Sequence, residues 1–253
     1  MTSWSLFLMI FARMAGMVFL FPYFSWRGIP VMLRVFITVL LSFLVFLALG
    51  NTFDFVPPAG PETVFVLGGE VIVGLAIGYL VVVFFAVFMM GGEMVSRQAG
   101  LMFARVFDPT FGGQSNILGQ FYMMLAIVFY LTINGHHLLI RALMDSYTLI
   151  PPGFGLSDPA LSGSLVRLTA DALIISFKIV APIMIVLLIF NIALGLVAKT
   201  VPQIHIFILS LPVKILGSWL LLLATFPFLI RLFENLLEWI LGFMYQFMQG
   251  WTL

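Results

Sequence analysis

The chain has 253 residues, of which 63% are hydrophobic and only 8% are charged, and its mean hydropathy is +1.21. Soluble domains carry roughly 25% charged residues, so this chain cannot cover a water-facing surface and is expected to be an integral membrane protein. The net charge of +1 gives no reason to expect a nucleic-acid partner, and the absence of cysteine excludes disulfides, thiolate metal sites and cysteine nucleophiles.

Six apolar stretches approach the roughly 20 residues that a membrane-spanning helix needs. They cover residues 4–24, 31–50, 64–92, 117–140, 172–198 and 215–230. Helix is expected throughout, because an open sheet would leave unpaired backbone groups in lipid and no alternating pattern suggests a barrel. The first charge is Arg13, so the first stretch is expected to be retained and not cleaved as a signal peptide.

The segments between these stretches include two predicted loops. Proline pairs and glycines predict them at residues 51–63 and 145–164. The last piece of the chain, from Arg231 to Leu253, is amphipathic, with Glu234 and Glu238 one turn apart. It could lie at the membrane interface or cross the membrane.

Arg13, Glu70 and Lys178 are charged residues that lie well inside the apolar stretches. A charge at the bilayer centre costs at least about 2.5–3.5 kcal/mol, so such side chains usually face protein or water. Glu70, Gly74 and Gly78 recur every fourth residue and therefore share one face of a helix. Because small residues let helix backbones approach closely, this face is expected to pack on another helix, with Glu70 near a donor.

Two further groups of polar residues have helical spacing. Glu93 and Arg97 form an (i, i+4) pair in the stabilising order, and His137, Arg141 and Asp145 share one face. Such groups could form a proton or ion relay, or polar contacts between subunits; the acids are scattered and mostly near cations, which favours contacts. The residues predicted as buried polar groups or subunit contacts are Arg13, Glu70, Gly74, Gly78, Glu93, Arg97, His137, Arg141 and Lys178.

No catalytic or cofactor-binding motif is found in the sequence. His136 and His137 are adjacent, so their side chains diverge on a helix and do not form a zinc-binding pair; a buried, hydrogen-bonded histidine at a helix end is expected instead. HExxH, GxSxG, P-loop and dinucleotide-binding glycine patterns are all missing. We therefore expect no enzyme activity, no cofactor and no metal site.

The stretch RVFDPTFGGQSN (105–116) interrupts the apolar chain. A helix is expected to continue to about Phe103, but the proline in this stretch disfavours helix at Asp108, so a loop should follow. Ser115 or Asn116 is expected to cap the next helix. Irregular backbone at membrane depth is tolerated only where protein covers it or water bathes it. A polar loop with aromatic side chains could therefore plug a pore, or it could be an ordinary surface connection.

The run GLMFARVFDPTFGGQSNILGQFYMMLAIVFYLTINGHHLLIRAL (100–143) resembles the FliR family of flagellar export proteins, called SctT or SpaR in injectisomes. The similarity rests on four elements that have the order and spacing found in the family. They are the FDP element (107–109), the NGHH element (134–137), NIALGLVAKTVPQIHIFILSLPVK (191–214) and FPYFSWRGIPVMLR (21–34).

The resemblance implies a single export-gate domain over residues 1–253. The implied fold is an all-α membrane protein whose broken helical hairpins pack in a hetero-oligomeric, helical export-gate complex. Its implied function is that of a non-catalytic subunit of the type III protein export gate, which forms a gated pore for unfolded substrates with FliP-like and FliQ-like subunits. FlhB-like and FlhA-like subunits and membrane lipid are the other implied partners. The implied location is the bacterial inner membrane, in the flagellar basal body, with part of the chain at periplasmic level.

In that family, the loop after the FDP element projects into the lumen and helps to block the closed channel. The plug implied for this chain consists of Phe107, Asp108, Pro109, Thr110, Phe111, Gly112, Gly113, Gln114 and Ser115. The main alternative is a self-contained secondary transporter with Glu70, Lys178 or Arg13 in a midplane site, which the lack of internal repeats disfavours. The sequence does not distinguish a flagellum from an injectisome.

Overall fold

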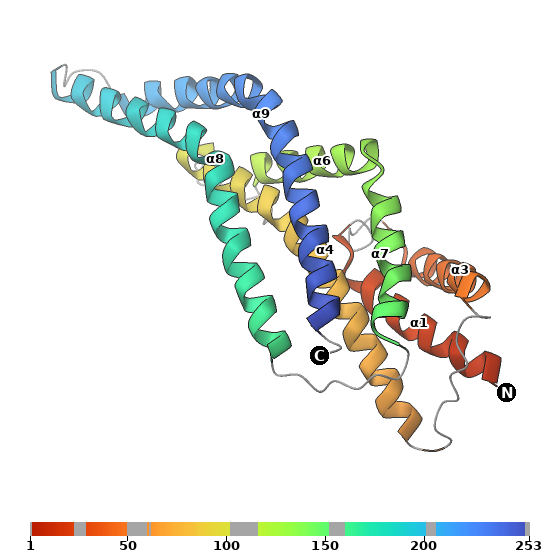
Figure 1. The fold of residues 1–253 in the computed structure, drawn as a ribbon. Coiled ribbons are helices and arrows are strands. Elements are labelled where there is room, and N and C mark those ends of the chain that lie inside the picture. The colour runs from red at the N-terminus through yellow and green to blue at the C-terminus, as the bar shows by residue number, and fades with distance from the viewer. Residues whose placement is uncertain are drawn as a thin grey trace. The chain divides into compact units, whose positions relative to one another are not determined.

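The computed structural model describes residues 2–22, 29–49, 60, 62–101, 116–151, 160–200 and 206–250, and contains helices but no strands within these ranges. The helices are α1 (Thr2–Leu20), α3 (Val31–Leu49), α4 (Glu62–Gln98), α6 (Ile117–Thr132), α7 (Gly135–Leu149), α8 (Ala160–Thr200) and α9 (Ile206–Gly250) (Figure 1). Four of them, α3, α4, α8 and α9, are long and apolar enough to cross a membrane. The predicted all-α membrane fold is confirmed.

The six apolar stretches do not form six straight spans, in agreement with the broken helices that the family resemblance implied. The first apolar stretch forms α1, whose apolar part, Trp4–Leu20, is shorter than the spans of the other helices. The fourth stretch, 117–140, is divided at Ile133 and Asn134 into α6 and α7, which pass as a span only if the bent pair is counted as one. Asn134 has φ 57°, a left-handed conformation that interrupts a right-handed helix.

Helices α8 and α9 extend well beyond the apolar stretches from which they were predicted, to 41 and 45 residues. The predicted loop at 145–164 is helical at both ends, because α7 continues to Leu149 and α8 begins at Ala160. The piece after Arg231 continues α9. Pro182 lies inside α8, and Pro212 and Pro227 lie inside α9. Figure 1 shows that both helices change direction along their length, as helices commonly do at proline.

The chain divides into two compact units. Unit 1 consists of Met1–Phe84, Asn134–Arg167 and Glu238–Leu253, and unit 2 consists of Phe85–Ile133 and Leu168–Leu237. Unit 1 contains α1, α3 and α7, and unit 2 contains α6; α4, α8 and α9 contribute to both. That the whole chain acts as one export-gate domain stays a prediction.

Aromatic side chains from three helices pack together inside unit 2. The ring of Phe129 on α6 lies 5.7 Å from the rings of Phe226 and Phe233 on α9, measured between centroids. Phe233 also lies 5.2 Å from Phe88 on α4. All three pairs are tilted, a geometry in which ring edges meet ring faces favourably. This cluster joins α4, α6 and α9 within the unit.

Candidate functional site

The side chain of Arg13, in the middle of α1, is fully buried in unit 1. Its Nε donates to Oε2 of Glu70 on α4 at 2.7 Å, and the two side chains are 0% and 2% exposed. The ion pair therefore joins two helices through charges that neither helix could carry alone into an apolar environment at low cost.

The remaining donors of Arg13 bind the end of α7. Nη1 donates to the carbonyl oxygen of Ser146 at 2.9 Å and to its hydroxyl at 3.2 Å, and Nη2 donates to the carbonyl oxygen of Ile150 at 2.9 Å. The last carbonyls of a helix have no partner within the helix and carry partial negative charge, so a guanidinium there is stabilising. Tyr147 completes the centre, with its ring 4.3 Å below the guanidinium carbon and its hydroxyl donating to the carbonyl oxygen of Ile10.

We call Arg13, Glu70, Ser146, Tyr147 and Ile150 the arginine centre. It connects α1, α4 and the C-terminal end of α7 inside one chain. Each nitrogen of the guanidinium already donates to a group of the same chain, so the centre has the properties of a structural junction. This arrangement disfavours a midplane transport site built from the same two charges.

Glycines bring the backbones of α1 and α4 into direct contact beside the arginine centre. A β-carbon at Gly74 would overlap the carbonyl oxygen of Arg13, and one at Gly78 would lie 2.9 Å from the carbonyl oxygen of Met17. Gly16 on α1 would likewise overlap a carbonyl oxygen of α4. The helix that packs on the face of Glu70, Gly74 and Gly78 is therefore α1, at a separation that only glycine allows.

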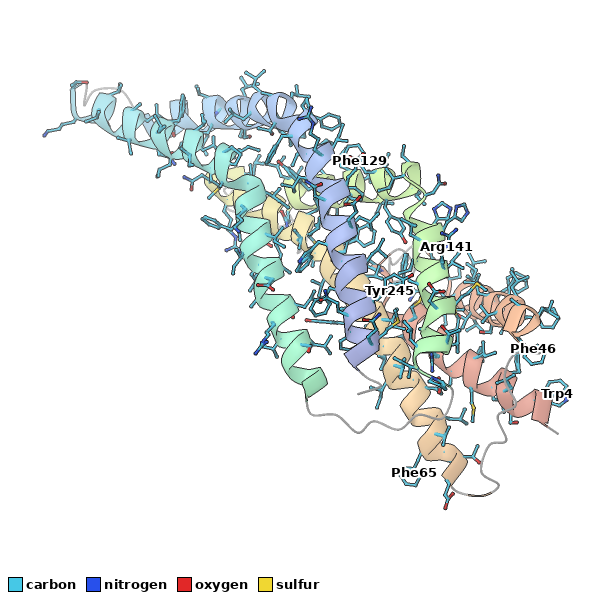
Figure 2. The ribbon with its side chains drawn as sticks, in the orientation of Figure 1. Trp4, Phe46, Phe65, Phe129, Arg141 and Tyr245 are labelled. Atoms are coloured by element: carbon cyan, nitrogen blue, oxygen red, sulfur yellow. The ribbon has the colours of Figure 1, made fainter. Side chains whose placement is uncertain are left out.

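The other predicted polar residues lie at the surface of the chain. Glu93 and Arg97 form the expected ion pair on α4, but their side chains are 32% and 63% exposed. His137 and Arg141 are exposed on α7, where Figure 2 shows Arg141, and Lys178 is exposed on α8. Whether these side chains contact other subunits stays a prediction.

A second polar contact links α7 to the C-terminal end of α9 within unit 1. The hydroxyl of Tyr245 donates to Oδ2 of Asp145 at 2.6 Å (Figure 2). The sequence placed Asp145 on one face of a helix but gave no sign of this partner, which lies 100 residues further along the chain. Asp145 and Ser146 are neighbours, so α9 and the arginine centre hold the same turn of α7.

Tyr245→Phe is expected to destabilise the chain by about 1–2 kcal/mol, because it removes a hydrogen bond to a charged acceptor that is partly exposed. Asp145→Asn keeps an acceptor oxygen and is expected to cost less. Thermal unfolding midpoints of the two purified variants in the same detergent measure the difference. An unchanged midpoint for Tyr245→Phe would show that the contact contributes nothing to stability.

The two adjacent histidines follow the break between α6 and α7. Their rings lie 4.1 Å apart between centroids, so the expectation that these side chains diverge is wrong. His137 is exposed and His136 is half-buried. Nδ1 of His136 is shielded from solvent without a hydrogen-bond partner, so the expectation of a hydrogen-bonded histidine is wrong at that atom. No group of three or more metal-binding side chains occurs in the part of the chain that the structure describes.

The predicted plug, Phe107–Ser115, lies outside the described residues, but both of its flanking helices are described. Helix α4 ends at Gln98 and not near Phe103, because Gly100 takes a left-handed φ of 80° two residues later. Of the two predicted caps for α6, Asn116 is the residue used: its side chain accepts a hydrogen bond from the backbone N–H three residues later at 2.9 Å.

The helices before and after the predicted plug meet at Gly92. A β-carbon there would lie 2.6 Å from the carbonyl oxygen of Leu118 and 2.8 Å from the α-carbon of Gly119. On the other side of α4, a β-carbon at Gly91 would lie 3.0 Å from the side chain of Val180 on α8. The first turn of α6 is therefore in backbone contact with α4, about one and a half turns before α4 ends.

The structure defines a helical membrane protein with a buried charged junction and a broken apolar helix pair. Residues 4–240 match the family described as bacterial export proteins, family 1. Over 236 residues, the chain is 30% identical to the flagellar biosynthetic protein FliR of Bacillus subtilis (strain 168), covering 90% of this chain and 89% of that protein. The chain belongs to the FliR family of bacterial export proteins, as its FDP and NGHH elements predicted.

Other relatives show the same extent of similarity. The chain is 31% identical to FliR of Caulobacter vibrioides over 221 residues, which are 85% of this chain and 86% of that protein. It is 28% identical to FliR of Escherichia coli (strain K12) over 227 residues, or 88% of this chain and 85% of that protein. The similarity thus extends over nearly the full length of the relatives.

Proposed function

We propose that the chain is a non-catalytic subunit of the type III protein export gate of the bacterial flagellum. In this proposal it lies in the inner membrane at the flagellar basal body and forms a gated pore for unfolded substrates with FliP-like and FliQ-like subunits. FlhB-like and FlhA-like subunits are further partners. The observation that carries the proposal is membership of the family, with FliR relatives from several bacteria over most of the chain.

The uncovered surface of α8 supports assembly with other subunits. Only 28% of the apolar window in α8 and 17% of that in α9 is buried within the chain, compared with 67% in α4. On α8, Asp171 and Lys178 are both exposed, and their spacing of two turns places them on one face. Charges within an apolar helix are costly in lipid, so this face is suited to contact with protein.

The arginine centre favours this function over a secondary transporter. Arg13 and Glu70, two of the three charges that the alternative considers for its site, bind each other, and Arg13 also binds the end of α7. Lys178, the third, is exposed on α8. A stable junction is what a subunit needs if it must keep its own shape while its outer helices bind neighbours.

We further propose that residues 107–115 form the plug of the closed pore. The flanking helices support this role, because the contact of Gly92 with Leu118 holds α4 against the start of α6, and Asn116 caps α6. With these two helices held together, a segment between them could be displaced by a substrate without the helices separating.

Deleting residues 107–115 is expected to make the membrane leak small ions without preventing assembly of the gate. The measurement is the conductance of membranes that contain the assembled complex, with an equal amount of the unaltered complex as the reference. A variant in which Phe107 and Phe111 are both replaced by alanine should leak less than the deletion, because the backbone of the loop is retained. Unaltered permeability in the deletion variant would exclude the plug but not the gate.

Co-purification provides a separate test of the gate assignment. FliP-like and FliQ-like subunits are expected to remain bound to the tagged chain after mild detergent extraction, and loss of the chain is expected to stop export and motility. A chain that is stable alone in detergent and takes up solute in vesicles would instead support the transporter alternative.

A further inference from the structure

Two helices of unit 1, α7 and the last part of α9, together present a polar surface. They run side by side in the same direction (Figure 1), and the hydrogen bond from Tyr245 to Asp145 joins their polar rows. We call this surface the α7–α9 polar face; its residues are His137, Arg141, Asp145 and Thr148 on α7, and Glu238, Gly242, Tyr245, Gln246 and Gln249 on α9. Each row covers eleven steps of helix, so the face is about 17 Å long.

The last part of α9 has the pattern of a helix with one side in water. At about 100° per residue, its polar positions fall within an arc of roughly 100°, and Ile240, Met244 and Met248 are buried on the opposite side. From Glu238 to Gln249, every exposed residue of this helix is polar or glycine. This stretch of α9 therefore offers no apolar side chain to a neighbour on its exposed side.

The row on α7 is also polar and carries the opposite charge. His137, Arg141 and Thr148 are exposed, whereas the apolar side chains of α7 are at most 36% exposed. Arg141 is positive and Glu238, on the neighbouring row, is negative. The centre of a contact between subunits is normally apolar and depleted of charged residues. The α7–α9 polar face lacks this centre, which favours contact with water over contact with another subunit.

The depth of this face distinguishes an enclosed passage from open solution. Helix α3, a candidate membrane span whose exposed side chains are apolar, packs on α1 where the rings of Phe7 and Phe46 meet at 5.9 Å. The end of α7 packs on the same helix at Ile10 and Arg13, within about 9 Å of Phe7 along α1. The polar face thus reaches nearly the depth of an apolar span. Charged side chains at that depth usually face protein or a water-filled cavity.

From its polarity, its lack of an apolar centre and its depth, we propose that the α7–α9 polar face lines the water-filled passage of the assembled gate. The proposal rests on the proposed function and adds to it the surface that an unfolded substrate meets inside the passage. His137 and Arg141 then face water and not another subunit.

A wall of this composition suits the transit of an unfolded chain. A passage conducts only if its contacts with the moving species are weak enough to let it leave. The amides of Gln246 and Gln249 keep their hydration, and the exposed side of α9 has no apolar side chain that could hold the apolar residues of a substrate. Because Arg141 and Glu238 have opposite charges, neither acidic nor basic substrates are retained along the whole face.

Cysteine accessibility tests the proposal, because the chain contains no cysteine of its own. The variants Thr148→Cys, Gln246→Cys and Gln249→Cys are each assembled with the partner subunits in lipid nanodiscs, so that a reagent can enter the passage from both ends. The rate of reaction with a cationic methanethiosulfonate, which needs water and a thiolate, is measured with and without a stalled export substrate. The substrate is stalled by a fused domain that stays folded. Leu143→Cys, buried on α7, and Val39→Cys, on the apolar side of α3, are the controls.

The expected result is a fast reaction at the three positions of the polar face, which the stalled substrate slows several-fold, and a slow reaction at both controls in either sample. Equal rates with and without the substrate would place the face in open solution. Slow rates without the substrate would mean that a subunit or lipid covers it. Either result would overturn the proposal while leaving the gate assignment intact, because co-purification of the partners and of the stalled substrate is read from the same samples. Failure of the stalled substrate to co-purify would overturn both.

Discussion

Arg13→Met is expected to lower the free energy of unfolding by about 3–5 kcal/mol, the cost of removing one partner of a buried ion pair. The substitution leaves the buried carboxylate of Glu70 without its cation and the carbonyl oxygen of Ile150 without the donor from Arg13, while the carbonyl oxygen of Ser146 keeps only the backbone N–H of Ile150. Domains are typically stable by only about 5–15 kcal/mol, so a loss of this size should sharply reduce the amount of folded chain in the membrane.

The double variant Arg13→Met/Glu70→Met is the informative comparison. Replacing both members of a buried ion pair by apolar side chains of similar volume is often close to neutral, so the double variant should be more stable than Arg13→Met. It should remain less stable than the unaltered chain, because the end of α7 loses its cap. Arg97→Met removes one partner of the exposed pair on α4 and is expected to cost less than about 1 kcal/mol.

The measurements for this series are the amount of full-length chain in the membrane and the thermal unfolding midpoint of the purified protein. The expected order of stability is Arg97→Met, then the double variant, then Arg13→Met. If Arg13→Met were as stable as Arg97→Met, the arginine centre would not contribute to the stability of the fold. If the double variant were the least stable, replacing the carboxylate of Glu70 by an apolar side chain would cost more than leaving it buried without its cation.

The residues of the arginine centre could be predicted only in part from the sequence. Helical spacing placed Glu70, Gly74 and Gly78 on one packing face, and the cost of charge in lipid marked Arg13 as a residue that needs a partner. The partner of Glu70 could not be identified, since Arg13 lies 57 residues away. The acceptors on α7 are backbone carbonyls, which every residue has and which leave no signal in the sequence.

Arg13 and Glu70 were predicted as buried polar groups or subunit contacts, and they bind each other within one chain. The sequence left both readings open, because spacing along a helix identifies which residues share a face but not whether the facing helix belongs to the same chain. The ends of helices are also hard to predict from the sequence. A span predicted from hydropathy ends at the first charged residue, but the backbone hydrogen bonds of α9 continue past Arg231. Side-chain chemistry at a cap is local, and Asn116 was therefore among the predicted residues.

Gly74→Ala is expected to destabilise the chain by about 1–3 kcal/mol, because its methyl group would overlap the carbonyl oxygen of Arg13 on α1. The obstacle is backbone, which cannot rotate aside as the end of a side chain could, so the two helices must separate. Alanine favours helix over glycine by about 1 kcal/mol, which offsets part of this loss. Gly74→Leu adds more volume at the same place and should prevent the folded chain from accumulating.

Gly68→Ala is the matched control for this prediction. It lies on the same helix, where a β-carbon would have no neighbour within 4 Å, so only the gain in helix propensity remains and the unfolding midpoint should stay the same or rise. A loss in both variants would assign the effect to the flexibility of α4 and not to its contact with α1.

The two predictions are coupled, because the atom that Gly74→Ala displaces belongs to Arg13 itself. Moving that part of α1 away from α4 also draws the guanidinium away from Glu70, so the cost of Arg13→Met should be smaller in the Gly74→Ala background than in the unaltered chain. Substitutions at sites in contact are expected to be non-additive in this way, by about 0.5–3 kcal/mol. A double-mutant cycle on thermal unfolding measures this term, and strict additivity would mean that the ion pair and the glycine contact stabilise α1 independently.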